Sequence, residues 1–312
     1  MSHTQHTTQP APQMTAHHRQ WQGTTDGTPW MHRALIRSLA WTGLPFFYAV
    51  MALVVPFYML CNHQGYISQY HFFRRRLGRS PLRSVVDVYA NHFRFGQIII
   101  DRFACYGGRR FKLIGDGDER FAALCDEPGG FMQIGTHVGN FELAGYMLSQ
   151  EKKRIHAIVF GGEKSTVMEN RMRLFARQNL RLILANGGID HVFEMNRALA
   201  DGDIVSINGD RIFGSQKTVA ARILGAEAQL PLGPYILAAL REVPVLCTFV
   251  MKETTDTYHL YVRELLLTPQ QKALPPRRRA AALAQAYGDH LTDILRRYPH
   301  QWLNYYEFWG DN

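Results

Sequence analysis

Several sequence motifs of common enzyme classes are missing from this chain of 312 residues. It contains no GxSxG, so a serine nucleophile elbow of the hydrolase type has no candidate. Neither GxxxxGK[ST] nor GxGxxG is present, which removes the common phosphate-binding loop and the dinucleotide fingerprint. No HExxH occurs, and His137, Glu142 and His156 have no recognised metal-ligand spacing. We therefore expect no metal and no nucleotide cofactor.

Cysteine is also scarce. The four cysteines are scattered without a CxxC pair, at Cys61, Cys105, Cys125 and Cys247. A zinc knuckle has no candidate and a disulfide framework has no support, which fits a reducing compartment. With 46% hydrophobic residues the chain can bury a sizeable core. One large α/β domain of about 250 residues and two smaller domains are both open.

Charge is absent from the 23 residues 39–61. Roughly 20 apolar residues cross a bilayer, although Pro45 and Pro56 would kink such a helix. We expect a hydrophobic membrane anchor over residues 30–63, spanning the bilayer or lying in its interface, with a buried core helix as the alternative. Residues 1–29 are rich in Thr, Gln, Pro and His, lack apolar periodicity and are expected to form a disordered tail. The folded domain is then expected over residues 64–312.

From Phe111 onward, short β-like runs alternate with helical patterns. The runs are FKLIG, FMQIG, IHAIVF, LRLIL, DIVSI and VPVLCTFV, separated by segments such as STVMENRMRLFARQN and GIDHVFEMNRALA. Such alternation is typical of βα units, so we predict an α/β fold with a mainly parallel sheet flanked by helices. TYHLYVREL alternates apolar and polar residues and is predicted to be an antiparallel edge strand. A helix over residues 277–297 should pack back with its Ala and Leu residues inward.

The segment FMQIGTHVGNFELAGYML places His137 and Glu142 five positions apart, where a short apolar run meets an amphipathic helix. Residues five apart on a straight helix point about 140° away from each other, so the pair can meet only if the histidine lies in the bend ahead of the helix. A carboxylate on one imidazole nitrogen fixes the tautomer and raises the basicity of the other, which suits a general base. The alternative is a surface histidine beside a helix-capping acid.

Three further stretches match a known family in order. In ALADGDIVSINGDRIFG a helix and a strand precede an Asp-containing turn and a glycine, which places Asp210 and Gly214; the others are LPLGPYILAALREVPVLCTFV and RRYPHQWLNYYEFW. Together with the HxxxxE pattern, these blocks resemble the lipid A biosynthesis acyltransferases of the lauroyl/myristoyl-transferase type, within the lysophospholipid acyltransferase superfamily. The resemblance covers roughly residues 35–309. In that family the last block usually ends in a basic, Arg-containing aromatic run, whereas NYYEF stands at residues 304–308 here.

The resemblance implies a lysophospholipid acyltransferase-like fold. It also implies that the protein lies at the cytoplasmic face of the bacterial inner membrane. It implies transfer of a fatty acyl group from an acyl thioester to a hydroxyl or amine of a lipid or glycolipid acceptor. Acyl carrier protein is favoured as the donor over acyl-coenzyme A. Since no nucleophilic Ser or Cys is identified, the acceptor itself should attack, deprotonated by His137, which Glu142 would orient.

Five other residues are candidates for substrate binding or oxyanion stabilisation. Backbone amides of the turn, including those of Gly139 and Asn140 at a helix N-terminus, can stabilise the oxyanion. Arg211 is a candidate charge partner, although Asp210 and Arg211 have an ordinary alternative as an ion pair that stabilises a turn. Arg171 can bind an acceptor phosphate or be merely solvated on a helix face.

The net charge of +9 raises the question of nucleic acid. The basic residues lie in separate clusters rather than interleaved with aromatics in one motif, at 74–76, 109–112, 152–154 and 277–279. Anionic lipid headgroups and an acidic acyl carrier protein explain them more simply, so we expect no nucleic-acid partner. Two other classes stay open as alternatives: a non-catalytic lipid-binding protein with the same fold, and a basic nucleic-acid-binding protein.

Overall fold

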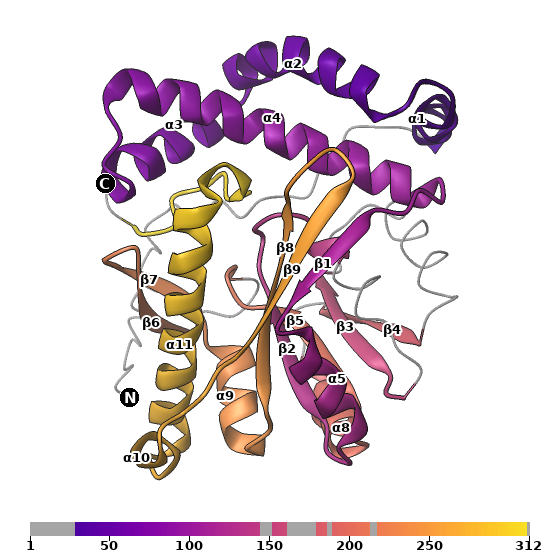
Figure 1. Cartoon of the computed structure of the whole chain (residues 1–312). Helices are drawn as coiled ribbons and strands as arrows, with labels where there is room; N and C mark the ends of the chain where they lie inside the picture. The colour runs from indigo at the N-terminus through magenta and orange to yellow at the C-terminus, as the bar shows by residue number, and fades with distance from the viewer. Residues whose placement is uncertain (1–28, 144–151, 161–178, 186–188, 213–216, 311–312) are drawn as a thin grey trace, which may run out of the picture.

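A computed structural model describes residues 29–143, 152–160, 179–185, 189–212 and 217–310. Its centre is a seven-stranded sheet in the order β1-β9-β8-β2-β5-β3-β4. Helices lie along both faces of this sheet, and a layer of N-terminal helices crosses one end of it (Figure 1). In sequence order, the strands are β1 (Lys112–Asp116), β2 (Phe131–Gly135), β3 (Ile155–Phe160), β4 (Leu180–Ala185), β5 (Ile204–Asn208), β8 (Val245–Lys252) and β9 (Thr257–Glu264).

The five strands from β8 to β4 are mutually parallel, which confirms the predicted mainly parallel α/β sheet. Strand β9 is antiparallel to β8, as expected, but the prediction that it forms an edge is wrong, because β1 pairs with its outer side. Alternating polarity reports the two faces of a strand and says nothing about whether its hydrogen-bonding edges are paired. The edge strands among the described residues are β1 and β4.

Each face of the sheet has its own core. Helix α5 (Asp118–Asp126) covers one face, where Phe121 and Leu124 pack against Phe131. The opposite face is covered by α8 (Asp190–Ala200), α9 (Leu232–Arg241) and α11 (Pro276–Arg297). The last of these confirms the helix predicted over residues 277–297. Short elements complete this side, namely the antiparallel pair β6 (Thr218–Ile223) and β7 (Ala226–Pro231), α10 (Pro269–Lys272) and the 3-10 turn η2 (Pro299–Gln301).

The N-terminal layer contains four helices and a π-helical turn. They are α1 (Pro29–Thr42), α2 (Leu44–Cys61), α3 (His63–His71), the π-helical turn η1 (Phe72–Arg76) and α4 (Pro81–Tyr106). Ser80 caps α4 by accepting from the Arg83 amide, and Pro81 fits the first helical position because it needs no donor there. Helix α2 runs across the molecule against α4 (Figure 1). The expected single anchor over residues 30–63 is thus two helices separated at Gly43, whose φ is +77°.

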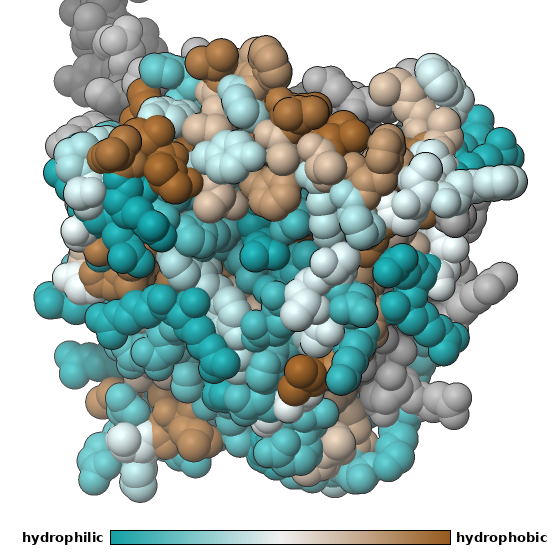
Figure 2. Space-filling model, turned by 45° about the horizontal axis from the view of Figure 1, so that its top comes forward, coloured by the Kyte–Doolittle hydropathy of each residue, from teal (hydrophilic) through white to brown (hydrophobic). Residues whose placement is uncertain are grey.

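One side of α2 is open to solvent. Only Leu44, Tyr48 and Val55 of this helix are buried, while Leu53, Phe57 and Leu60 are 73%, 71% and 81% exposed. Figure 2 shows apolar side chains gathered over this layer of helices. Among the described residues, α2 is long and apolar enough to cross a membrane. It is not the buried core helix of the alternative interpretation, because most of its surface lacks a protein partner.

Candidate active site

The site forms where two neighbouring parallel strands end. Gly135 at the end of β2 is paired in register with Asn208 at the end of β5. Two residues beyond the end of each strand lie His137 and Asp210, so the two side chains meet at this carboxyl edge of the sheet. The imidazole Nδ1 lies 2.8 Å from Asp210 Oδ1, and the backbone N–H of His137 donates to Oδ2 at 2.8 Å. The Thr136 hydroxyl also donates to Oδ2, at 3.1 Å.

This arrangement fixes the tautomer of the imidazole. An ionised carboxylate can only accept, so Nδ1 carries the proton and the lone pair lies on Nε2. Burial and the Arg211 charge lower the pKa of His137, against the opposing effect of Asp210. Burial alone would raise the pKa of Asp210, but the imidazole and its hydrogen bonds hold that pKa below its usual value. A neutral histidine beside an ionised aspartate is the state that a general base requires.

The carboxylate on the imidazole is therefore Asp210 and not Glu142. Glu142 Oε2 lies 3.0 Å from Arg102 Nε and accepts from the Tyr106 hydroxyl at 3.1 Å. Both partners belong to the last turns of α4. The expected His137–Glu142 pair is corrected for this physical reason: the glutamate faces α4, whereas the histidine turns toward the neighbouring strand end.

Glu142 still reaches the imidazole through two other side chains. The Arg102 guanidinium lies over the Phe141 ring at 5.6 Å, and that ring meets the His137 imidazole edge-on at 4.9 Å. The positive charge of Arg102 contributes to lowering the pKa of His137. The negative charge of Glu142 balances that of Arg102, so among these side chains the glutamate is linked to the imidazole through Arg102 and Phe141.

The turn that carries His137 is held by strand β8 and by the C-terminal block. The Gly139 amide donates to the Gln301 carbonyl and the Asn140 amide to the Val250 carbonyl, each at 2.8 Å. These two amides are already paired, so the expectation that they stabilise an oxyanion is corrected. Gly139 has φ +63°, and a Cβ there would lie 2.1 Å from the Val250 carbonyl oxygen. Only glycine fits this conformation and this close approach.

The C-terminal block, to which Gln301 belongs, holds the turn at two further points. Trp302 is buried and forms an antiparallel bridge with Val138, and the Leu303 amide donates to the His137 carbonyl at 3.0 Å. The carbonyl of Leu303 accepts from Arg211 Nη2 at 2.7 Å. The Pro-x-Gln-Trp pattern near the C-terminus is thus part of the scaffold of the site.

A model of the family described as bacterial lipid A biosynthesis acyltransferase matches residues 107–309. The chain belongs to this family. The match starts where α4 ends and includes His137, Asp210 and the C-terminal block. A search of curated proteins finds no match to this chain.

Membership makes this protein an acyltransferase with a lipid acceptor. The remaining candidate residues are Arg211 and Arg171. The Arg211 guanidinium lies against the face of the Tyr306 ring and donates to the Leu303 carbonyl. The Asp210 side chain is paired with His137. The alternative of an Asp210–Arg211 turn pair is therefore not the arrangement found. Arg171 lies outside the described residues and stays an expectation.

Asn208 was missed by the sequence reasoning. Its side-chain nitrogen lies 3.4 Å from His137 Nε2 and donates toward the lone pair of that atom. The signal available in the sequence was a polar residue at the end of a strand, directly before the Gly-Asp turn. Reading that signal requires knowing that β5 lies beside β2. Within the described ranges, no group of three His, Cys, Asp or Glu side chains is arranged to hold a metal in this acyltransferase.

Glu142→Gln should lower kcat about tenfold with little change in KM. The amide keeps the shape but loses the charge that balances Arg102, and a hydrogen bond between charged groups contributes about 1.5–3 kcal/mol. Steady-state acyl transfer measures this effect. Glu127→Gln is the matched control, because Glu127 pairs with Arg120 on the surface. A loss as large as that of a His137 variant would instead favour direct contact between Glu142 and the base during turnover.

Proposed function

We propose that this acyltransferase moves a fatty acyl group from an acyl thioester to a hydroxyl or amine of a lipid or glycolipid, with acyl carrier protein favoured as the donor. The observation that carries the proposal is the buried His137–Asp210 pair, whose geometry leaves Nε2 as the proton acceptor. The pair lies at the carboxyl edge of a parallel sheet, where α/β enzymes commonly bind their ligands.

The proposed reaction needs no covalent enzyme intermediate. Nε2 of His137 takes the proton of the acceptor as its oxygen or nitrogen attacks the thioester carbonyl. The tetrahedral intermediate then expels the thiolate, which takes the proton back from the imidazolium, so atoms and charge balance. Asp210 stabilises the imidazolium between the two steps. Asn208 is a proposed amide donor to the reacting groups, since its Nδ2 lies beside Nε2.

The position of the basic clusters bears on the donor. Helix α11 has 22 residues, or about 33 Å at 1.5 Å per residue, and η2, which holds the His137 turn, follows its far end. Residues 277–279 lie in the first turn of this helix and are therefore distant from the base. Residues 74–76 form the end of η1, and Arg76 lies over the ring of Trp309, close to the C-terminal block. We propose this second cluster as the dock for an acidic carrier protein.

The apolar helix supports membrane association. The apolar face of α2, which consists of Phe46, Val50, Leu53, Val54, Phe57 and Leu60, is exposed. The opposite side is bonded to α4, since Tyr89 donates to the Ala52 carbonyl at 3.0 Å and Tyr48 donates to Asp101. Spanning the bilayer would break these bonds. We therefore propose that residues 30–63 lie in the interface of the inner membrane, at its cytoplasmic face, with residues 64–312 as the acyltransferase domain.

The protein should sediment with membranes and stay there in high salt. Burial of an apolar face is insensitive to ionic screening, which removes purely electrostatic binding. Flotation of the protein with lipid vesicles, with and without about 1 M salt, measures this. At that ionic strength the Debye length is about 3 Å, so electrostatic binding is screened. Leu53→Asp with Leu60→Asp should weaken the association, whereas the same change at Leu266, an exposed leucine beyond β9, should not. Full release of the wild type by salt would refute the interfacial anchor.

An acyl-transfer assay with mass-spectrometric readout tests the proposed reaction. Acyl-carrier protein or acyl-coenzyme A is incubated with the protein and a bacterial lipid extract, and thioester loss and lipid acylation are both followed. Matched gains in acylated lipid and free thiol support the proposal. Lipid binding by the folded protein without any thioester consumption would favour the non-catalytic alternative. Retention on nucleic acid at moderate ionic strength would favour the other alternative.

A further inference from the structure

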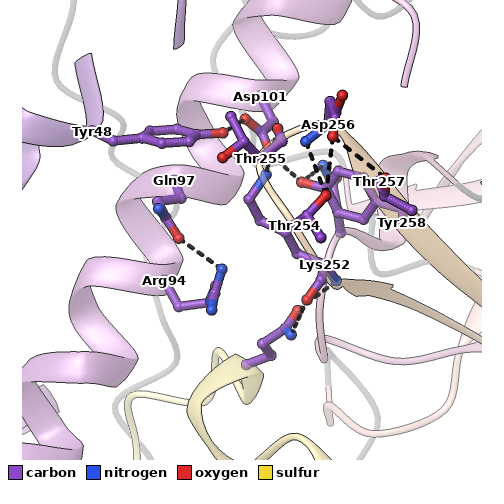
Figure 3. Close-up of polar contacts among 12 residues, drawn as sticks. Tyr48, Arg94, Gln97, Asp101, Lys252, Thr254, Thr255, Asp256, Thr257 and Tyr258 are labelled. Atoms are coloured by element: carbon purple, nitrogen blue, oxygen red, sulfur yellow. Dashed lines mark hydrogen bonds and ion pairs between the residues drawn. The ribbon is translucent and has the colours of Figure 1, made fainter. Parts of the chain in front are cut away.

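We propose that Asp101 and Lys252 are positioning residues. They couple the packing of α2 against α4 to the geometry of the turn that carries His137. The inference rests on the proposed role of His137 as the base. Asp101 is on α4 and Lys252 ends β8, and both side chains are fully buried. Figure 3 shows the two groups meeting between the helix and the sheet, with Tyr48 and Tyr258 pointing at the same carboxylate.

The carboxylate of Asp101 joins three elements of the fold. Lys252 Nζ lies 2.5 Å from Oδ2 and donates also to the Thr255 carbonyl at 3.2 Å. The Tyr48 hydroxyl of α2 donates to Oδ1, and the Tyr258 hydroxyl of β9 donates to Oδ2. One side chain of α4 is therefore bonded to the apolar helix on one side and to two strands on the other.

From this cluster, two chains of hydrogen bonds reach the His137 turn. In the first, the Tyr258 hydroxyl accepts from Asn140 Nδ2 at 3.3 Å. In the second, the backbone of Lys252 forms two bonds of 2.8 Å with the Gln301 side chain. The carbonyl of Gln301 in turn accepts from the Gly139 amide. Both chains end on residues two and three positions after His137.

The composition of the cluster favours positioning over simple packing. A buried ion pair gains little stability over apolar side chains of the same volume, while it demands one geometry of its partners. Lys252 Nζ also lies 5.2 Å and 4.9 Å from the ring centres of Tyr48 and Tyr258, so the cation is enclosed by aromatic faces. A shift of α2 on α4 moves the Tyr48 hydroxyl off this carboxylate. Lys252 and Tyr258, the other partners of Asp101, must then rearrange. Asn140 is bonded to Tyr258 and Gln301 to Lys252, so both are affected.

The test compares two single-atom deletions in the same helix interface. Tyr48→Phe removes the hydroxyl that bonds Asp101, whereas Tyr89→Phe removes the hydroxyl that bonds the Ala52 carbonyl. We expect Tyr48→Phe to lower kcat about tenfold, as for the loss of one hydrogen bond to a charged group, with KM for the donor unchanged. Tyr89→Phe should leave kcat within about twofold. Membrane association should be the same for both variants.

A second readout does not depend on activity. Hydrogen exchange of a peptide that contains residues 137–140 should be faster in Tyr48→Phe than in the wild type, because the Gly139 and Asn140 amides lose part of their support. Tyr258→Phe loses the bonds to both Asp101 and Asn140, so exchange and kcat should change more. Equal kcat and equal exchange in Tyr48→Phe and Tyr89→Phe would overturn the coupling.

The two proposals fail in different ways. If the wild type shows no acyl transfer, the proposed function falls, while the exchange measurement still decides the coupling between α2 and the turn. If His137→Ala is inactive but Tyr48→Phe behaves like Tyr89→Phe, the base assignment stands and the coupling is refuted.

Discussion

Replacing Asp210 with asparagine should reduce acyl transfer by about 10²- to 10⁴-fold while the protein stays folded. The carboxylate now accepts both from Nδ1 and from the backbone N–H of His137. An asparagine has a single acceptor oxygen, and if that oxygen keeps the backbone bond, its NH₂ group faces Nδ1. The proton then moves to Nε2, and the lone pair needed for catalysis points away from the acceptor.

The pH profile provides a signature of this mechanism. Burial lowers the pKa of His137 and Asp210 opposes that shift, so removing the negative charge should lower the pKa further. The acid limb of kcat/KM, which reports protonation of the free base, should therefore move to lower pH in Asp210→Asn even as the rate falls. A limb that moves to higher pH would contradict the assignment of Asp210 as the charge on the imidazole.

A matched control lies at the other end of the same strand. Asp203 directly precedes β5 and pairs with His156 at 2.9 Å, which repeats the Asp–His contact away from the site. Asp203→Asn should leave kcat within about threefold, since a partly exposed pair contributes at most about 1 kcal/mol. His137→Ala should match Asp210→Asn in size, and the double variant should lose little more, because groups that act as one unit are not additive. Activity of His137→Ala within a few-fold of wild type would refute the base.

The sequence was sufficient to predict the class of fold and the turn that carries His137. Apolar runs such as FMQIG and DIVSI predicted strands that the structure contains, and the glycines around His137 predicted the turn. The order of the strands could not be predicted, because side-chain periodicity defines faces and not neighbours. Pairing His137 with Glu142 was an inference from local spacing. Asp210, 73 residues away, became the partner through the register of β2 and β5.

The buried cluster around Lys252 is beyond sequence reasoning for a related reason. A lone lysine at the end of an apolar strand is usually solvated, and the acidic residues nearest to it in the chain, Glu253 and Asp256, are not its ion-pair partner. Its partner Asp101 lies 151 positions earlier, on an amphipathic helix whose buried side carries several polar residues. Such polar residues on an inner helix face are typical of side chains that are bonded to other elements.

Lys252→Met should lower the free energy of unfolding by about 3–5 kcal/mol at neutral pH, the usual penalty for leaving one charge of a buried pair alone. Burial already raises the pKa of Asp101, and loss of the lysine removes the charge that opposes this effect. The folded variant then binds a proton more tightly than the unfolded chain, whose carboxyl keeps its ordinary pKa. Folded stability therefore falls as pH rises past the unfolded pKa and levels off above the folded one. The penalty of Lys252→Met should shrink as the pH is lowered from 7 toward 5.

Urea unfolding of the detergent-solubilised protein at both pH values measures this, with Lys152→Met as the control. Lys152 pairs with Asp126 on the surface, where an ion pair contributes at most about 1 kcal/mol. Adding Asp101→Asn to Lys252→Met should recover part of the stability, because the orphaned negative charge is gone while one of the two tyrosine hydroxyls keeps its acceptor oxygen. Should the penalty be the same at pH 5 and pH 7, or no larger than that of the surface control, the pair carries no buried charge of this kind.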